Sequence, residues 1–437
     1  MASELKTWRV RELTATGVLE VGDGYRAKND ELGTSGFPFA RAGNINAGFQ
    51  FSGADRFPFE NVAKVGRKLS QVGDVVFTSK GTVGRFAFVE PGTEQFVYSP
   101  QLCYWRSLVP SEIDPRFLYY WMQSGECLDQ FSYLKGQTDM ADYVSLRDQQ
   151  AMNITLPSHE IQLAVTGVLA PIDNRIAELE TTSATLESIA RAIFKSWFVD
   201  FDPVRAKTEG REPEGMDVAT AALFPEAINS STGLPVGWVY KELRELASAN
   251  RQTMSKGYPH AAIQYVDISS VEPGRIQSTK AYALADSPSR AKRLVQDGDV
   301  IWSCVRPNRR SFALVIDPEP NLVCSTGFVT LSAESVPFSY LYMSVTSNGF
   351  VDYLTQRADG AAYPAVRPDV FEKAELIVPS ETIAARFNEI AEPMLRAVAR
   401  NQMIAKTLAK LRDTLLPRLI SGKLRVPEAE KLVEAAL

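Results

Sequence analysis

Two short stretches, LPSHEI at residues 156–161 and VPSETI at residues 378–383, introduce long helical patterns that begin 222 positions apart. In each stretch a serine follows a proline, as Ser158 and as Ser380. A serine hydroxyl accepts a hydrogen bond from a free N–H group in the first turn of a helix, so both serines are predicted N-caps. The glutamate that follows each serine favours the positive end of the helix dipole. The chain therefore contains the same helix start twice.

Each helical pattern contains an internal proline, Pro171 in the first and Pro393 in the second. Because proline removes a helical hydrogen bond, each helix is expected to kink or restart there. Beyond the prolines, side chains recur at alternating steps of four and three, which is the spacing of a coiled-coil seam. The residues proposed for helix pairing and partner docking are Ile172, Ile176, Leu179, Leu186, Ile193, Trp197, Met394, Asn401, Leu408, Leu411 and Leu415.

The matched seams predict that residues 172–198 and 394–420 form an antiparallel pair of helices. The alternative is two ordinary amphipathic helices that each cover their own domain. Matched caps and matched prolines favour the mutual pair. Asn401 is a polar interruption of the seam and is suited to fixing its register, at some cost in stability.

Composition indicates a globular protein of two or more domains. The chain has 437 residues, 45% of them hydrophobic and 23% charged, with a net charge of −5. No run of about 18 apolar residues occurs, and residues 1–6 carry no apolar signal region, so a cytoplasmic protein outside the membrane is expected. The four cysteines and two histidines follow no metal-ligand spacing, so no metal site is expected. The negative net charge leaves room for local basic faces.

Turn and strand patterns predict an α+β fold with two mixed α/β domains in tandem. The linker is inferred from its proline, glycine and serine content. The expected order is a first domain at 1–157, a first helical region at 158–200, a linker at 201–234, a second domain at 235–379, a second helical region at 380–424 and a C-terminal tail at 425–437.

The second half of the chain repeats the first. WVYKEL at residues 238–243 matches WRVREL at residues 8–13, and FSYLYM at 338–343 matches FLYYWM at 117–122. A Gly-Asp turn before a predicted strand also recurs, at Gly73 and at Gly298. Separate features at a nearly constant offset indicate a tandem duplication. Each half is expected to be one globular domain followed by one long helix.

Known catalytic signatures are missing from the sequence. It contains neither a phosphate-binding loop of the Gly-x-x-x-x-Gly-Lys-Ser/Thr type nor a Gly-x-Ser-x-Gly elbow. Two histidines leave little for general-base chemistry. The residues of a common nuclease metal cluster and of an Asp/Asn-Pro-Pro-aromatic methyltransferase motif are also missing. The sequence therefore predicts no catalytic residue in this chain.

Loops rich in basic and amide side chains are the candidate functional sites. KGTVGR at residues 80–85 and VRPNRR at residues 305–310 both link two predicted strands, and the second loop is the more basic. Lysine, arginine and free backbone N–H groups suit phosphate contacts, whereas arginine and amide side chains also pair with base edges. A solvated surface charge is the alternative for each residue taken alone. The candidate DNA-binding residues are Arg41, Asn44, Asn46, Lys80, Thr82, Arg85, Gln101, Gln137, Arg306, Asn308, Arg309, Arg310 and Tyr363.

The chain resembles the specificity subunit of type I restriction–modification systems. The resemblance lies in ARAIFKSWFVDFDPV at residues 190–204 and in LRDTLLPRLISGKL at residues 411–424, which look like the endings of that family's two conserved helical regions. The two basic loops also look like recognition-domain sequence of the family. The resemblance covers the chain from about Trp8 to Leu424.

The resemblance implies two target-recognition domains separated by two long antiparallel coiled-coil helices. It implies that the chain binds double-stranded DNA at a bipartite asymmetric target, with one domain for each half-site. The implied partners are two modification subunits that carry the methyltransferase and restriction subunits that carry nuclease and translocase. S-adenosylmethionine, ATP and Mg²⁺ would serve those partners, and no cofactor is implied for this non-catalytic chain.

Two alternatives stay open at the level of sequence. A two-domain scaffold that binds proteins without DNA would use the same tandem architecture, and only salt-dependent DNA binding separates the two readings. A self-contained nuclease would need metal-dependent cleavage by this chain alone, for which its sequence offers no metal site.

Overall fold

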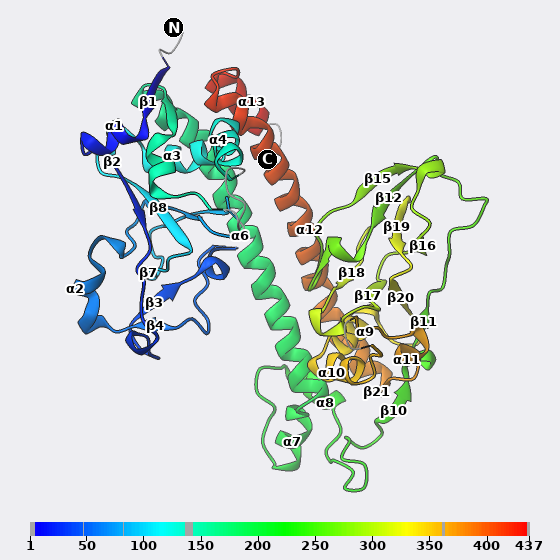
Figure 1. The fold of residues 1–437 in the computed structure, drawn as a ribbon. Coiled ribbons are helices and arrows are strands. Elements are labelled where there is room, and N and C mark those ends of the chain that lie inside the picture. The colour runs from blue at the N-terminus through cyan, green and yellow to red at the C-terminus, as the bar shows by residue number, and fades with distance from the viewer. Residues whose placement is uncertain (1–4, 47, 82, 136–142, 361–362, 435–437) are drawn as a thin grey trace. The chain divides into compact units, whose positions relative to one another are not determined.

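The computed structural model describes residues 5–46, 48–81, 83–135, 143–360 and 363–434. The chain divides into two compact units, and many of their elements are labelled in Figure 1. Unit 1 comprises Met1–Glu178 and Ile404–Leu437, and unit 2 comprises Leu179–Met403. Each unit contains small β-sheets, short helices and one part of each of two long helices.

The two long helices are α6 (His159–Phe198) and α12 (Glu381–Ile420), each of 40 residues. Each begins directly after its predicted serine cap. The expectation that the helices restart at their prolines is wrong, because both helices are unbroken. A proline removes only the hydrogen bond to the carbonyl four residues earlier. Buried neighbours, Ile172 beside the first proline and Leu395 beside the second, hold the rest of each turn in place.

Unit 1 is built on a four-stranded antiparallel sheet in the order β2-β8-β5-β6. A three-stranded sheet in the order β4-β3-β7 and a two-stranded sheet of β1 and β9 complete it. Its strands are β1 (Lys6–Arg9), β2 (Leu19–Asp23), β3 (Phe37–Ala40), β4 (Arg56–Phe57), β5 (Val75–Thr78), β6 (Phe86–Phe88), β7 (Val97–Tyr98), β8 (Leu102–Ser107) and β9 (Asn153–Leu156). Its shorter helices are α1 (Val10–Ala15), α2 (Val62–Val65), α3 (Pro115–Met122), α4 (Gly125–Lys135), α5 (Leu146–Ala151) and α13 (Val426–Glu434).

Unit 2 has the corresponding four-stranded sheet in the order β11-β20-β17-β18 and a second sheet in the order β15-β12-β19-β16. Its strands are β10 (Val239–Glu242), β11 (Ala247–Ala249), β12 (Ala262–Val266), β13 (Val271–Glu272), β14 (Arg275–Ile276), β15 (Lys280–Ala283), β16 (Ala291–Leu294), β17 (Val300–Ser303), β18 (Phe312–Leu314), β19 (Leu322–Ser325), β20 (Phe328–Ala333) and β21 (Glu375–Val378). Its shorter helices are α7 (Asp202–Thr208), α8 (Val218–Leu223), α9 (Phe338–Val345), α10 (Asn348–Gln356) and α11 (Pro368–Glu372).

The strand pairings repeat between the units in detail. In each unit one pair of strands is parallel, β3 with β7 and β12 with β19, inside an otherwise antiparallel arrangement. The first and last strands of each domain also pair, β1 with β9 and β10 with β21. Shared pairing of this kind requires the same chain path, so the duplication predicted from the sequence is present in the fold.

The register of the repeat differs from the sequence match at the start of each domain. Matching Trp8 with Trp238 gives an offset of 230, but the backbone N–H of Val10 bonds to Met152 O as that of Leu243 bonds to Ala374 O. Those hydrogen bonds make Val10 and Leu243 equivalent, an offset of 233. VREL at 10–13 therefore corresponds to LREL at 243–246, and the matching tryptophans occupy different positions.

The aromatic helices shift in the same way. A side chain added at Gly73 would meet Pro115, the first residue of α3, and one added at Gly298 would meet Phe338, the first residue of α9. Pro115 and Phe338 are therefore equivalent, an offset of 223 where the sequence match of FLYYWM with FSYLYM gives 221. Packing contacts identify the register of the repeat, because equivalent residues of the two units lie against the same neighbour.

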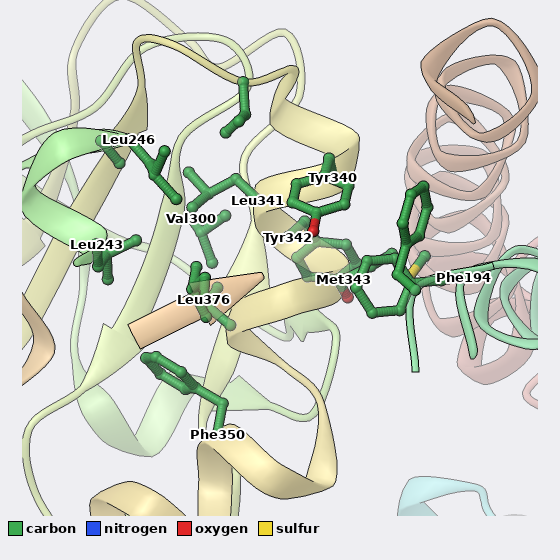
Figure 2. Close-up of a cluster of buried hydrophobic side chains, with 14 of the residues drawn as sticks. Phe194, Leu243, Leu246, Val300, Tyr340, Leu341, Tyr342, Met343, Phe350 and Leu376 are labelled. Carbon is green, nitrogen blue, oxygen red and sulfur yellow. The ribbon is translucent and has the colours of Figure 1, made fainter. Parts of the chain in front are cut away.

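Aromatic side chains attach the long helices to the domain core of unit 2. Phe194 of α6 lies 5.5 Å from Tyr340 of α9 and 5.7 Å from Phe387 of α12, measured between ring centroids. Figure 2 shows Phe194 pointing toward Tyr340 and Met343, with Leu243, Leu246 and Val300 deeper in the same cluster. Burial of such large rings stabilises the attachment by several kcal/mol, about 1.5–3 kcal/mol for each ring.

In unit 1 the two long helices are joined by a charge pair. Arg412 Nη1 of α12 lies 2.8 Å from Asp173 Oδ1 of α6, and Tyr120 of α3 donates a hydrogen bond to the other oxygen of that carboxylate at 2.7 Å. In unit 2 Phe194 meets Phe387. The partner number in α12 falls as the number in α6 rises, as in an antiparallel pair. The predicted α+β fold with two mixed domains and two long antiparallel helices is confirmed.

Residues 201–234, predicted as a linker, contain both regular structure and buried side chains. Helices α7 and α8 lie in this segment, and Phe201, Phe224 and Leu234 are buried in the core cluster of unit 2. Its prolines and glycines break the segment into short pieces without exposing all of it.

Candidate nucleic-acid interface

Three separate segments of unit 1 bring most of the first-half candidates together. The segments are the 3₁₀-helix η2 (Ala42–Ile45), the loop between β5 and β6, and the turn before β8. The backbone N–H of Ala42 donates to Gln101 Oε1 at 3.2 Å, and Arg85 Nη1 donates to Asn46 Oδ1. Segments 39 and 59 positions apart in the chain thus contribute to one polar surface.

The side chains of two of these candidates, Asn44 and Arg41, form hydrogen bonds or ion pairs with nearby residues. Asn44 accepts a hydrogen bond from the backbone N–H of Arg41 at 2.8 Å and donates one to the carbonyl of Gln50 at 2.8 Å, so its amide holds η2 in shape. The Arg41 guanidinium lies 2.7 Å from Asp55 Oδ2, with both side chains about half exposed. The structure therefore assigns Asn44 a role in shaping η2 and gives Arg41 a neutralising partner.

Lys80 lies at the end of β5 over the ring of Tyr143. Its Nζ is 4.8 Å from the ring centroid, and the backbones of the two residues form a β-bridge. A cation over an aromatic face is attracted by the ring quadrupole, so the ring helps to hold the ammonium in place. The remaining first-half candidates, Thr82 and Gln137, lie outside the described residues.

The second-half candidates gather on the loop between β17 and β18. The Arg306 guanidinium carbon lies 4.4 Å from the ring centroid of Tyr363, and its backbone N–H donates to Pro364 O at 2.7 Å. Arg310 Nη2 donates to Asn348 Oδ1 at 2.7 Å, at the start of α10. These contacts place Arg306, Arg310 and Tyr363 on one surface.

Asn308 and Arg309 lie in the same loop, in or beside the 3₁₀-helix η8 (Pro307–Arg309). Both are exposed, and among the residues that the structure describes neither side chain has a hydrogen-bond or ion-pair partner. An exposed arginine without a carboxylate neighbour adds to the local positive potential.

Both basic loops use left-handed backbone angles near their two ends, although the loop of unit 2 is one residue longer, 304–311 against 79–85. Gly81 and Gly84 have φ angles of +76° and +93° in unit 1, and Arg306 and Arg310 have φ angles of +50° and +56° in unit 2. Glycine adopts these left-handed angles without strain, whereas any other residue there costs about 1–2 kcal/mol. Unit 2 thus carries arginine at both strained positions of the loop, where unit 1 carries glycine.

Sequence reasoning missed Tyr143 and Asn348. Each contacts a candidate basic side chain from a segment more than thirty positions away. A signal for Tyr143 did exist, because Tyr143 and Tyr363 both precede the last short helix of their domains. A set of candidate residues chosen from loop composition alone cannot include such partners, since composition does not show which loops meet.

The helix-pairing candidates differ in burial. Those that are buried are Ile172, Leu179, Trp197, Leu408 and Leu415. Those that are partly exposed are Ile176, Leu186, Ile193, Met394, Asn401 and Leu411. Ile193 and Met394 pack against the core cluster of unit 2. The partly exposed residues leave apolar surface on the helices.

Two further properties concern what the described residues lack. None of the helices in the described ranges is both long and apolar enough to cross a membrane. Within those ranges, no three histidine, cysteine or acidic side chains are grouped so that they could hold a metal ion.

Two curated relatives and one solved structure show what this chain is similar to. No protein-family model matches it. It is 24% identical over 410 residues to the type I restriction enzyme HindI specificity subunit of Haemophilus influenzae, a match that covers 82% of this chain and 88% of that protein. It is 20% identical over 436 residues to the type I restriction enzyme MjaIX specificity subunit of Methanocaldococcus jannaschii, covering 97% of this chain and 95% of that protein.

Among solved structures, the fold is similar to that of the S subunit of a type I restriction–modification system from M. genitalium. The TM-score is 0.56 at 13% identity, and the match covers 96% of each chain. This likeness supports the fold, and the sequence matches extend along most of the chain. The resemblance found in the two helix endings is confirmed: the chain is related to the specificity subunits of type I restriction enzymes.

Proposed function

We propose that this chain is the sequence-specific DNA-binding specificity subunit of a type I restriction–modification complex. It is non-catalytic, and each of its two target-recognition domains reads one half of a bipartite, asymmetric target. The observation that carries the proposal is the basic loop between equivalent strands in both units, β5–β6 and β17–β18. A duplicated domain with a duplicated basic loop suits a target with two halves.

The chemistry of the loops supports DNA as the ligand. Lys80, Arg85 and the three arginines of the second loop supply charge-assisted donors for phosphate oxygens and for base edges. Asn46 and Gln101 add amide groups of the kind that pair with adenine. The loops differ between the units in length of side chain and in charge, as two half-sites of different sequence require.

The long helices and their partly exposed apolar residues are the proposed docking surface for partner subunits. Two modification subunits would bring the methyltransferase and S-adenosylmethionine, and restriction subunits would bring nuclease, ATP and Mg²⁺. Charged partners can also share the phosphate contacts, which accounts for a DNA-binding chain whose net charge is −5.

Salt-dependent binding tests the proposal. The complex of this chain with its modification subunits should bind target DNA with an affinity that falls steeply with salt, by a slope of about −0.9 for each phosphate neutralised. A chain that served only as a protein scaffold would add nothing to this slope and would give the complex no preference for one DNA sequence. Methylation sequencing of the source strain with and without the gene gives the target motif, which should vanish when the gene is deleted.

A further inference from the structure

The loop between β17 and β18 carries a conformational cost that its counterpart in unit 1 avoids. Arg306 and Arg310 adopt left-handed backbone angles, of +50° and +56°, at the positions of Gly81 and Gly84. Glycine is the residue that this backbone favours. Strained residues of this kind cluster at active sites and ligand-binding sites.

Each strained arginine also has a side chain held by a partner from a distant segment. The ring of Tyr363 lies against the Arg306 guanidinium at 4.4 Å, and Asn348 accepts a hydrogen bond from Arg310 Nη2 at 2.7 Å. A ring against the face of a guanidinium restricts the rotation of that side chain. A partner that fixes a long side chain before binding also lowers the entropy lost on binding.

A cation lies over a tyrosine ring in both units, at different positions of the two domains. The backbone bridge of Lys80 with Tyr143 corresponds to that of Val305 with Ala365. The cation of unit 2 is therefore one residue further along the loop than Lys80, and its tyrosine is two residues earlier than the equivalent of Tyr143. Both loops thus hold a cation against a tyrosine ring, through different positions of the two domains.

We propose that Arg306 and Arg310 are specificity-determining residues that read guanine in the second half-site, positioned by Tyr363 and Asn348. This inference rests on the proposed function and names the bases that one domain reads. The planar fork of an arginine matches the O6 and N7 acceptors of guanine in the major groove, which a lysine contacts only as a point charge. Lys80 of unit 1 therefore contacts the DNA backbone, and the arginines of unit 2 contact base edges.

The test separates stability from recognition in the assembled methyltransferase complex. Arg306→Gly and Arg310→Gly restore the residue of unit 1, so the melting temperature should stay within about 2 °C of the parent or rise. The methylated motif should lose one G·C position of the second half-site, with discrimination falling about 10- to 100-fold for each variant. The first half-site should be unchanged.

Arg309→Ala is the matched control, because it removes one positive charge from the same loop without touching a strained position. It should weaken binding to all sequences alike and lower the salt slope by about one. Arg306→Lys and Tyr363→Ala separate effects on folding from effects on recognition. Both variants should weaken the preference for guanine at the same target position. Tyr363→Phe, which retains the ring, should keep that preference.

The outcomes are distinct. Relaxation of a G·C position by the glycine variants, with the control weakening all sequences alike, supports the inference. Glycine variants that behave like Arg309→Ala, or that keep the parent motif, overturn it. If the glycine variants are less stable than expected, Arg306→Lys decides, and a retained motif in that variant overturns the inference. A parent complex that shows no sequence preference at all overturns the proposed function instead.

Discussion

A single aspartate shows how the two domains have diverged at the residue scale. Asp74 and Asp299 follow the repeated glycine, and each accepts a hydrogen bond from a backbone N–H three residues earlier, at 2.8 Å and 2.9 Å. Asp74 is also paired with buried Arg106, at 2.6 Å. Ser332 stands at the position of that arginine in unit 2, so Asp299 has lost the charge partner.

This difference predicts opposite effects of one substitution at equivalent sites. Asp74→Asn leaves the buried Arg106 guanidinium without its counter-charge and should lower the free energy of unfolding by about 3–5 kcal/mol. Asp299→Asn removes an ionised carboxylate whose Oδ1 has no hydrogen-bond partner among the described residues, and should raise that free energy by about 1 kcal/mol. Urea denaturation of both variants measures this, and equal losses at the two sites would contradict it.

The same aspartate predicts a dependence on pH. Burial raises the pKa of Asp299 above its ordinary value. The Asp299 carboxyl therefore makes its full contribution to the free energy of unfolding at pH values below its pKa in the unfolded chain. That contribution is lost as the pH rises through its higher pKa in the folded chain. The advantage of Asp299→Asn over the parent should grow as the pH increases through this window. Urea denaturation at several pH values tests it, and a constant difference would show that Asp299 does not titrate abnormally.

At the scale of elements, the pairing of the long helices depends on a few contacts. Asp173 and Arg412 are largely buried, with 17% and 25% of their side chains exposed, and Tyr120 completes the site. Arg175 and Glu178 form a pair on the same helix α6 but are 52% and 64% exposed. Water screens the second pair far more than the first.

The helix pair should therefore depend on Asp173 and not on its exposed neighbours. Asp173→Asn should lower the free energy of unfolding by about 1.5–3 kcal/mol, because a charged hydrogen bond is lost and Arg412 keeps its charge. The control Glu178→Gln should change it by less than about 1 kcal/mol. Thermal and urea denaturation of both variants measure these losses. Similar losses in Asp173→Asn and Glu178→Gln would show that the Asp173–Arg412 pair does not stabilise the helix pair.

Aromatic packing makes a second prediction for the same elements. Phe194→Ala removes a ring that contacts both Tyr340 and Phe387, so it should cost about 3–5 kcal/mol. Ile189→Ala, at a position on α6 that is 41% exposed, is the control and should cost much less. If the two substitutions have equal effects on unfolding, the attachment of α6 to the domain core does not depend on this ring.

At the scale of the whole molecule, the repeated fold predicts modular recognition. Replacing residues 1–157 by the corresponding domain of another specificity subunit should change one half of the methylated motif and leave the other half intact. The reason is that each candidate surface is built from loops of one domain. Sequencing of methylated DNA from cells with the chimera measures the outcome, and a motif altered in both halves would show that the domains read DNA jointly.

The sequence by itself determined the duplication, the two long helices and the place of the basic loops. These depend on local signals: serine caps, the spacing of the helical seam, and Gly-Asp turns before strands. The sequence predicted a kink or a restart at Pro171 and Pro393, because the local effect of a proline is visible in sequence. The packing that keeps both helices unbroken is not visible there.

Only the tertiary structure decided the register of the repeat and the members of the candidate interface. Sequence similarity aligned Trp8 with Trp238, whereas the backbone hydrogen bonds beside the paired end strands align Val10 with Leu243. Likewise, composition could not show that Tyr143 lies under Lys80 or that Arg306 takes the backbone angle of a glycine. Contacts between distant segments depend on how the whole chain folds, and no local pattern encodes which loops meet.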